Sequence, residues 1–178
     1  QENHIIISTI TGLKINEIEK VIGADKKIIR SMPNTAISVR KSLTCICSND
    51  TGSQFLDLCV SIFNSVGKAI IIDESKMQSA TVMCASGIAF WMRLIRAMAQ
   101  GGVELGFESK DSLEISYRTA QGAISLLEKN KTHPEQEIDK VTTPSGCTIK
   151  GIIEMENKGL SSAIIHGLIS SHEKINNI

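Results

Sequence analysis

The chain has 178 residues, of which 42% are hydrophobic, enough to bury the core of one ordinary domain or of two small ones. Lysine plus arginine equals aspartate plus glutamate at 19 each, and only 3% of the residues are aromatic. A neutral chain lacks the basic face that displaces counterions from nucleic acid, and it has few rings on which bases could stack. No nucleic-acid partner is therefore expected.

The cysteines are odd in number and lie mostly in apolar segments, which is typical of buried thiols in a reducing cytoplasm. Cys45 and Cys47 form a C-x-C pair, but no second pair or nearby histidine completes a zinc site. We therefore expect no metal and a cytoplasmic location. The five cysteines are Cys45, Cys47, Cys59, Cys84 and Cys147.

Short β-rich runs alternate with helical runs over residues 4–73. Strands are predicted at HIIIS, KKIIRSMP, LTCICS and KAIIID, and helices at KINEIEKVIG and TGSQFLDLCVSIFNSVG. Strands that alternate with helices are typical of a parallel sheet with helical crossovers. This half of the chain therefore predicts part of a doubly wound α/β domain.

Residues 76–100 hold no proline and one glycine, and they predict one long helix that Gly101 and Gly102 end. Its centre, residues 80–92, is apolar nearly all round, which is typical of a helix buried in a core or a subunit interface. We expect this run to be too short for a membrane, which takes roughly 20 apolar residues. No membrane partner is expected, and a second subunit is expected to cover the helix.

Four further helices are predicted, so that everything from Glu74 onward is all-α. THPE, residues 132–135, fits a capping box in which Thr132 caps the Glu135 amide and Glu135 reaches back. Gly159 separates the last two helices. The helix after Ser109 is expected to turn these residues inward: Leu113, Tyr117, Ala120, Ile124 and Leu127.

Residues 141–151, VTTPSGCTIKG, place hydroxyl-bearing and small residues directly before an apolar-periodic segment. Free amides and the dipole at a helix start can bind an anion, although this stretch alone also fits a simply capped helix end. No G-x-G-x-x-G follows the first strand, and the nearest string, GGVELG at 101–106, follows a helix instead. We expect the chain to be the later part of a longer polypeptide.

Six segments occur together in a familiar order: STITGLKINEIEKVIG, IIRSMPNT, FNSVGKAIIIDE, SATVMCASGIAF, GGVELGF and HPEQEIDKVTTPSGCTIKGIIEMENKG. In order and spacing they resemble pyrroline-5-carboxylate reductase over essentially the whole chain. The resemblance implies an α/β remnant of a Rossmann NAD(P)-binding domain in residues 1–73. It also implies an all-α helical dimerisation domain that binds substrate in residues 74–178, with the glycine-rich loop outside the chain.

The activity implied is reduction of (S)-1-pyrroline-5-carboxylate to L-proline with NADPH or NADH, by a homodimer or a higher homo-oligomer. The polypeptide as printed is expected to be inactive because the pyrophosphate cradle is missing. Two alternatives stay open. One is a non-catalytic dimerisation or regulatory module. The other is a related imine or β-hydroxyacid dehydrogenase, which is disfavoured because the long helix lacks the lysine that those enzymes use.

The resemblance assigns the substrate carboxylate to backbone amides around Ser145, Gly146 and Cys147, where glycine lets the main chain come close. The hydroxyl of Thr148 would bind the ring nitrogen, which makes it the one catalytic residue expected. Thr143 would support the loop.

Other residues match the family less specifically. Lys140 could attract the substrate carboxylate, and Ser86 with Gly87 matches a serine–glycine pair near the substrate, although Gly87 also fits simple helix packing. Asn34 and Glu74 would approach the cofactor, but a plain turn and a solvated helix-start acid are the alternatives. The backbone on the nicotinamide side would be that of Ser8, Thr9, Ile10 and Thr11.

Several positions depart from the family pattern. Ala36 replaces the proline that usually follows MPNT, and Ile88 and Phe90 replace the usual proline and tyrosine after Gly87. Ser145 replaces the first glycine of P-G-G. These changes leave Gly146 and Thr148 in place, so they bear on rate or substrate preference more than on reaction type.

Overall fold

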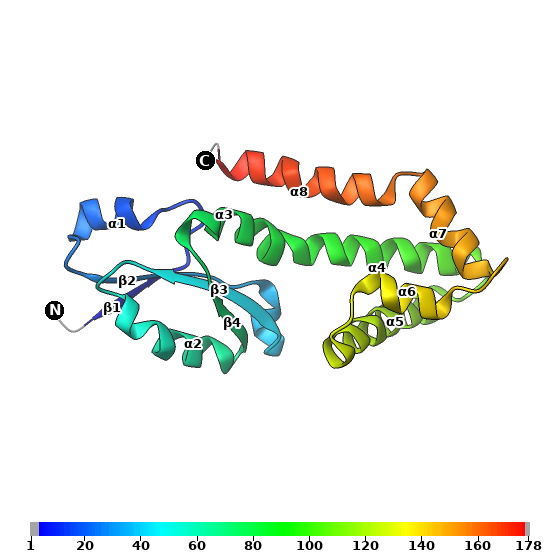
Figure 1. Cartoon of the computed structure of the whole chain (residues 1–178), viewed down its shortest axis with the longest axis horizontal. Coiled ribbons are helices and arrows are strands. Elements are labelled where there is room, and N and C mark those ends of the chain that lie inside the picture. Colours follow the sequence, from blue (N-terminus) through cyan, green and yellow to red (C-terminus); the bar gives the residue numbers. More distant parts are fainter. Residues whose placement is uncertain (1–3, 177–178) are drawn as a thin grey trace. The chain divides into compact units, whose positions relative to one another are not determined.

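The computed structural model describes residues 4–176, which fall into two compact units (Figure 1). Within the described residues, the first unit comprises residues 4–89 and 167–176, and the second comprises Phe90–His166. Each unit is described by itself below. The domain boundary predicted between residues 73 and 74 stays a prediction.

A four-stranded sheet forms the centre of the first unit. Its strands are β1 (Ile5–Ser8), β2 (Lys27–Met32), β3 (Ser42–Ser48) and β4 (Gly67–Ile71), in that order across the sheet. β1 pairs with β2 and β3 with β4 in parallel, but β2 and β3 are antiparallel. The expectation of a wholly parallel sheet is therefore wrong at this pair. Only residues 33–41, with the short helix η1 (Thr35–Val39), connect the two strands, whereas a parallel crossover takes about a dozen residues.

Helices cover both faces of this sheet, with α1 (Ile15–Ile22) on one face and α2 (Leu56–Asn64), preceded by η2 (Ser53–Phe55), on the other (Figure 1). Because side chains alternate along a strand, Ile28 of β2 packs in the cluster with α1, while Ile29 packs with Cys59 of α2. Cys45, Cys47 and Cys59 are buried, as predicted, but the prediction is wrong for Cys147, which is exposed. α1 ends at Gly23, whose φ is +100°, also as predicted.

The long helical segment after β4 has four parts: η3 (Glu74–Lys76), α3 (Met77–Ala80), the π-helical η4 (Thr81–Ser86) and α4 (Gly87–Glu104). The predicted stop at Gly101 and Gly102 is wrong, because α4 continues to Glu104 and the chain turns at Gly106 with φ +98°. Gly102 is needed inside the helix, since a Cβ there would collide with the Ser112 side chain.

The remaining helices are α5 (Ser109–Asn130), α6 (Pro134–Val141), α7 (Cys147–Asn157) and α8 (Leu160–Asn176). The inward face predicted for α5 is only partly covered by the chain itself: Leu113, Tyr117 and Ile124 are 48%, 40% and 48% exposed. The buried residues of α5 are Ser112 and Ser116. Ser112 Oγ donates to the Ala99 carbonyl at 2.6 Å, so small residues set the close approach of α5 to α4.

The cap of α6 lies one residue later than predicted. Pro134 occupies the first turn, as expected, and this makes His133 the N-cap. The Glu135 amide donates to His133 Nδ1 at 3.3 Å, and the His133 amide donates to Gln136 Oε1 at 3.0 Å. The predicted pairing of Thr132 with Glu135 is therefore wrong.

Among the described residues, the helical stretch Glu74–Glu104 is long and apolar enough to cross a membrane by length and composition. The expectation that its apolar run is too short therefore does not hold on those criteria. They are weak support for a membrane span, because core helices of soluble proteins satisfy them as well.

Candidate functional site

The predicted site residues fall into two groups. The first unit holds Ser8, Thr9, Ile10, Thr11, Asn34, Glu74, Ser86 and Gly87. The second unit holds Lys140, Thr143, Ser145, Gly146, Cys147 and Thr148. In the second group the Gly146 amide donates to the Thr143 carbonyl at 2.9 Å, whereas the residues of the first group lie on neighbouring elements of the first unit.

The carboxyl ends of β1 and β2 lie at one edge of the sheet because the two strands are parallel, with Ser8 paired to Arg30. The segment after β1 leaves the sheet there, and Asn34 follows β2 at the same edge. Ser8 Oγ accepts from the Ile10 amide at 3.4 Å, and residues 9–11 are exposed. Open α/β sheets bind ligands beside the carboxyl ends of their strands, so this edge is the candidate nicotinamide side.

Asn34 joins the turn after β2 to the π-helical segment. Its Oδ1 accepts from the Ala36 amide at 3.0 Å and caps η1, while its Nδ2 donates to the Cys84 carbonyl at 3.1 Å. Its own amide donates to Ser42 Oγ at 3.1 Å. Asn34 is therefore more than a plain strand-end turn, because its side chain connects two elements that are far apart in sequence.

Ser86 and Gly87 lie where the π-helical segment passes into α4. Such π turns occur frequently at functional sites because they change the direction of carbonyls and side chains within a helix. Gly87 is buried, yet a Cβ there would lie 3.6 Å from the Val82 carbonyl oxygen, an ordinary contact. Packing within the chain therefore does not require glycine at this position.

Glu74 makes two contacts with one carboxylate oxygen. Oε1 accepts from the Ile15 amide at 2.7 Å and from Arg30 Nη1 at 2.9 Å. The Arg30 side chain is 4% exposed and that of Glu74 is 34% exposed. Glu74 thus compensates a buried cation and places negative charge at the start of α1, so it is not simply a solvated helix-start acid. A cofactor contact of Glu74 stays a prediction.

Arg30 is a residue whose role sequence reasoning missed. It is a cation within the apolar run KIIRSM, and a charge inside a buried strand signals that an acidic partner must lie nearby. The partner, Glu74, is far away in the sequence, so composition alone could not identify it.

A tight turn precedes α7 in the second unit. The Gly146 amide donates to the Thr143 carbonyl at 2.9 Å, and Ser145 has φ +61° at the third position, where turns of this kind favour glycine. A Cβ on Gly146 would lie 3.0 Å from the Thr143 carbonyl oxygen and closer still to its hydroxyl. Gly146 is thus required by a close backbone approach.

The N-cap of α7 is Gly146, at which no side chain makes a capping hydrogen bond. The amides of the first turn therefore remain available to an outside acceptor, and the helix dipole favours an anion there. Ser145, Cys147 and Thr148 are exposed. The turn can present several amides and the Thr148 hydroxyl to one small ligand.

Lys140 already has an anionic partner. Its Nζ lies 2.7 Å from Glu137 Oε1, which also accepts from Thr132 and Asn130. The hydrogen bonds from Lys140, Thr132 and Asn130, in that order, lower the pKa of Glu137 to about 2. Because Glu137 compensates the charge of Lys140, attraction of a substrate carboxylate by Lys140 stays a prediction.

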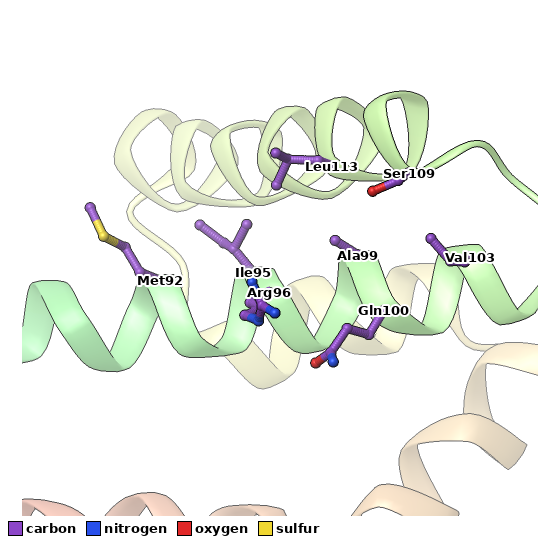
Figure 2. Close-up of a pocket in the computed structure, with 8 residues that line it drawn as sticks. All are labelled: Met92, Ile95, Arg96, Ala99, Gln100, Val103, Ser109 and Leu113. Carbon is purple, nitrogen blue, oxygen red and sulfur yellow. The ribbon is translucent and has the colours of Figure 1, made fainter.

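A groove of the second unit lies elsewhere, between α4 and α5, with a volume of about 340 Å³. Figure 2 shows Ile95 and Ala99 of α4 pointing toward Leu113 of α5. None of the predicted site residues lines it. Among the described residues, no group of three or more His, Cys, Asp or Glu side chains could hold a metal ion.

Comparison with known proteins gives the family. Residues 74–178 match the model of the pyrroline-5-carboxylate reductase dimerisation domain. Pyrroline-5-carboxylate reductases 1 and 2 of Dictyostelium discoideum are 45% and 44% identical over 97% of this chain, which covers 34% and 63% of their lengths. The chain thus spans between about a third and two thirds of these relatives.

Solved structures agree in fold. The 1-pyrroline-5-carboxylate reductase of Streptococcus pyogenes has a TM-score of 0.93 at 27% identity, over 99% of this chain and 68% of that one. The Plasmodium falciparum pyrroline carboxylate reductase, solved with NADP bound, has a TM-score of 0.91 at 27% identity, over 97% and 70%. The predicted fold class, part of a Rossmann domain followed by a helical dimerisation domain, is confirmed. The chain belongs to the pyrroline-5-carboxylate reductase family.

Proposed function

We propose that the protein carrying this chain reduces (S)-1-pyrroline-5-carboxylate to L-proline with NADPH or NADH, as the last step of proline biosynthesis. One observation carries the proposal: the uncapped, exposed first turn of α7, entered through a turn that requires Gly146. Membership of the family supplies the substrate class. A cyclic imine beside a carboxylate needs an anion site next to a hydroxyl, and this turn offers both.

The substrate carboxylate is held by the amides around Ser145, Gly146 and Cys147, where the helix dipole adds to the hydrogen bonds. The Thr148 hydroxyl contacts the ring nitrogen and orients its proton, which keeps the C=N bond polarised. The nicotinamide, when bound, supplies the hydride. The contribution of these residues is position and electrostatics, which account for much of the rate enhancement in hydride transfer.

The residues present fit one side of the cofactor. The edge formed by the ends of β1 and β2 offers the Ser8–Thr11 backbone and Asn34 to a nicotinamide. No G-x-G-x-x-G sequence follows a strand in the chain, so a pyrophosphate cradle is missing from these residues. A polypeptide limited to residues 1–178 is therefore proposed to bind NADPH poorly and to be inactive.

The same proposal includes a homodimer or a higher homo-oligomer. Its support is the match of residues 74–178 to a dimerisation domain and the partly exposed apolar residues of α4 and α5. The proposal also includes a small-molecule substrate and a cytoplasmic location. It includes neither nucleic acid nor a membrane as a partner.

The test is oxidation of NADPH and of NADH by the complete protein in the presence of pyrroline-5-carboxylate, with the 178-residue polypeptide as the comparison. We expect the complete protein to turn over and the 178-residue polypeptide not to. A complete protein that dimerises but turns over neither cofactor would instead be a non-catalytic dimerisation module, and the proposal would be wrong.

A further inference from the structure

Two cysteines from distant parts of the sequence meet in the first unit. Cys45 lies on β3 and is 1% exposed, whereas Cys84 lies half-buried on the π-helical segment, and their sulfur atoms are 3.5 Å apart. Cys84 packs against the buried cluster that contains Cys45. We propose that this pair is a thiol modification site, which a peroxide oxidises to an intramolecular disulfide.

The two thiols differ in a way that assigns their roles. The hydrogen bond from Cys45 lowers the pKa of Cys84 to about 7, while the same hydrogen bond and burial raise that of Cys45. Burial raises the pKa of Cys47 to about 11 and also raises that of Cys59. Since the thiolate is the nucleophile, Cys84 reacts first and Cys45 is the resolving thiol.

The chemistry balances with peroxide as the only oxidant. The Cys84 thiolate attacks one peroxide oxygen, the O–O bond breaks, and the sulfenic acid forms with loss of hydroxide, which a proton converts to water. The Cys45 thiol then loses its proton, and its sulfur displaces the hydroxyl group of the sulfenic acid as a second water. Two thiols are oxidised by two electrons in total, and one peroxide is reduced to two waters.

Closure of the bond asks for little movement. A disulfide has a sulfur–sulfur distance of about 2.0 Å, so the two atoms must approach by roughly 1.5 Å. The moving part is the π-helical segment, whose Cys84 carbonyl accepts from Asn34 and which ends at Ser86. Oxidation therefore acts on the contact that holds this segment to the turn after β2. Any effect on turnover rests on the proposed function, but formation of the disulfide does not.

The experiment treats the complete protein with hydrogen peroxide and then maps peptides by mass spectrometry without reduction. A linked peptide that joins Cys45 to Cys84, with loss of two free thiols and reversal by dithiothreitol, is expected. The same link is expected in Cys147→Ser, which removes the exposed thiol, and in Cys59→Ala, which removes a buried thiol on the other face of the sheet.

Two variants test the roles. Cys84→Ser should abolish the link, and Cys45→Ser, which keeps a hydrogen-bond donor beside Cys84, should leave Cys84 as a sulfenic acid that dimedone traps. The proposal is overturned if wild-type protein that has consumed peroxide carries Cys84 as a sulfenic or sulfinic acid without the link, or if Cys45 and Cys84 both remain free thiols while Cys147 is oxidised. Because the readout is covalent mass, the proposal can fail while the reductase function stands, and the reverse.

Discussion

Single residues decide the geometry of the turn before α7. The family resemblance assigns an anion site to VTTPSGCTIKG, and this assignment stays a prediction; no side chain caps the start of α7. The conformation of Ser145 could not be predicted from composition, because left-handed backbone is rare for serine and only the turn hydrogen bond between Gly146 and Thr143 imposes it. The one feature of the sequence that pointed to an unusual conformation here was Ser145 itself, which stands where the family pattern P-G-G has glycine.

Ser145→Gly should stabilise the second unit. Glycine removes the cost of a left-handed side chain, about 1–2 kcal/mol, but adds flexibility to the unfolded chain, so a net gain of up to about 1 kcal/mol is expected. Urea denaturation followed by circular dichroism measures it. Gly146→Ala is the matched control, and it should lower stability because its Cβ meets Thr143. A Ser145→Gly protein less stable than wild type would contradict this account of the turn.

Glu137 should make stability depend on pH under acidic conditions. Its pKa in the folded chain is lowered from 4.5 to about 2, chiefly by the hydrogen bond from Lys140. The stability that the ionised carboxylate contributes is therefore fully present above the unfolded pKa of 4.5, and it is lost as the pH falls from there to about 2. Thermal melts between about pH 5 and pH 2 should show a smaller fall of Tm for Glu137→Gln than for wild type. Equal slopes for both proteins would show that the carboxylate is not stabilised by its three donors.

Elements that depend on local pattern were predictable, and elements that depend on distant partners were not. The alternation of strands and helices up to Asp73 gave the right elements, and Gly23 gave the right end of α1. The antiparallel β2–β3 pair was missed because the length of the connection, rather than strand composition, decides it. The continuation of α4 past Gly102 was missed because the residue that requires this glycine, Ser112, lies on α5.

Two adjacent glycines provide a test of α4–α5 packing. In Gly102→Ala the new Cβ collides with Ser112, and overpacking of this kind costs about 1–3 kcal/mol. In Gly101→Ala nothing lies within 4 Å of the new Cβ, so better helix propensity should raise stability by up to about 1 kcal/mol. Chemical denaturation compares the two variants. Equal effects of both substitutions would contradict the packing described here.

At the scale of the whole molecule, much apolar surface is left uncovered by the chain itself. Trp91 and Met92 of α4 are 59% and 63% exposed, and Ile124 of α5 is 48% exposed. The sequence predicted this need for a second subunit from the apolar centre of the long helix. It could not predict which residues the chain covers, because the buried residues of α5 are Ser112, which bonds to Ala99 of α4, and Ser116, rather than the large side chains.

Ile124→Asp should weaken the proposed homo-oligomer, since burying a carboxylate in an apolar interface is unfavourable. Sedimentation of the complete protein should show that the Ile124→Asp variant dissociates at concentrations at least tenfold higher than those at which wild type dissociates. Val21→Asp is the control, because Val21 is 83% exposed on α1 of the first unit. The interface assignment is wrong if both variants assemble like wild type.

The most direct test of the central claim is the reductase activity of the complete protein after removal of the Thr148 hydroxyl. With NADPH and pyrroline-5-carboxylate, kcat/KM of Thr148→Val should fall by about a hundredfold or more, the scale of one lost transition-state hydrogen bond, while Thr148→Ser keeps most of it. Wild-type kcat/KM in Thr148→Val would show that the first turn of α7 does not hold the imine, and the proposed site would be contradicted.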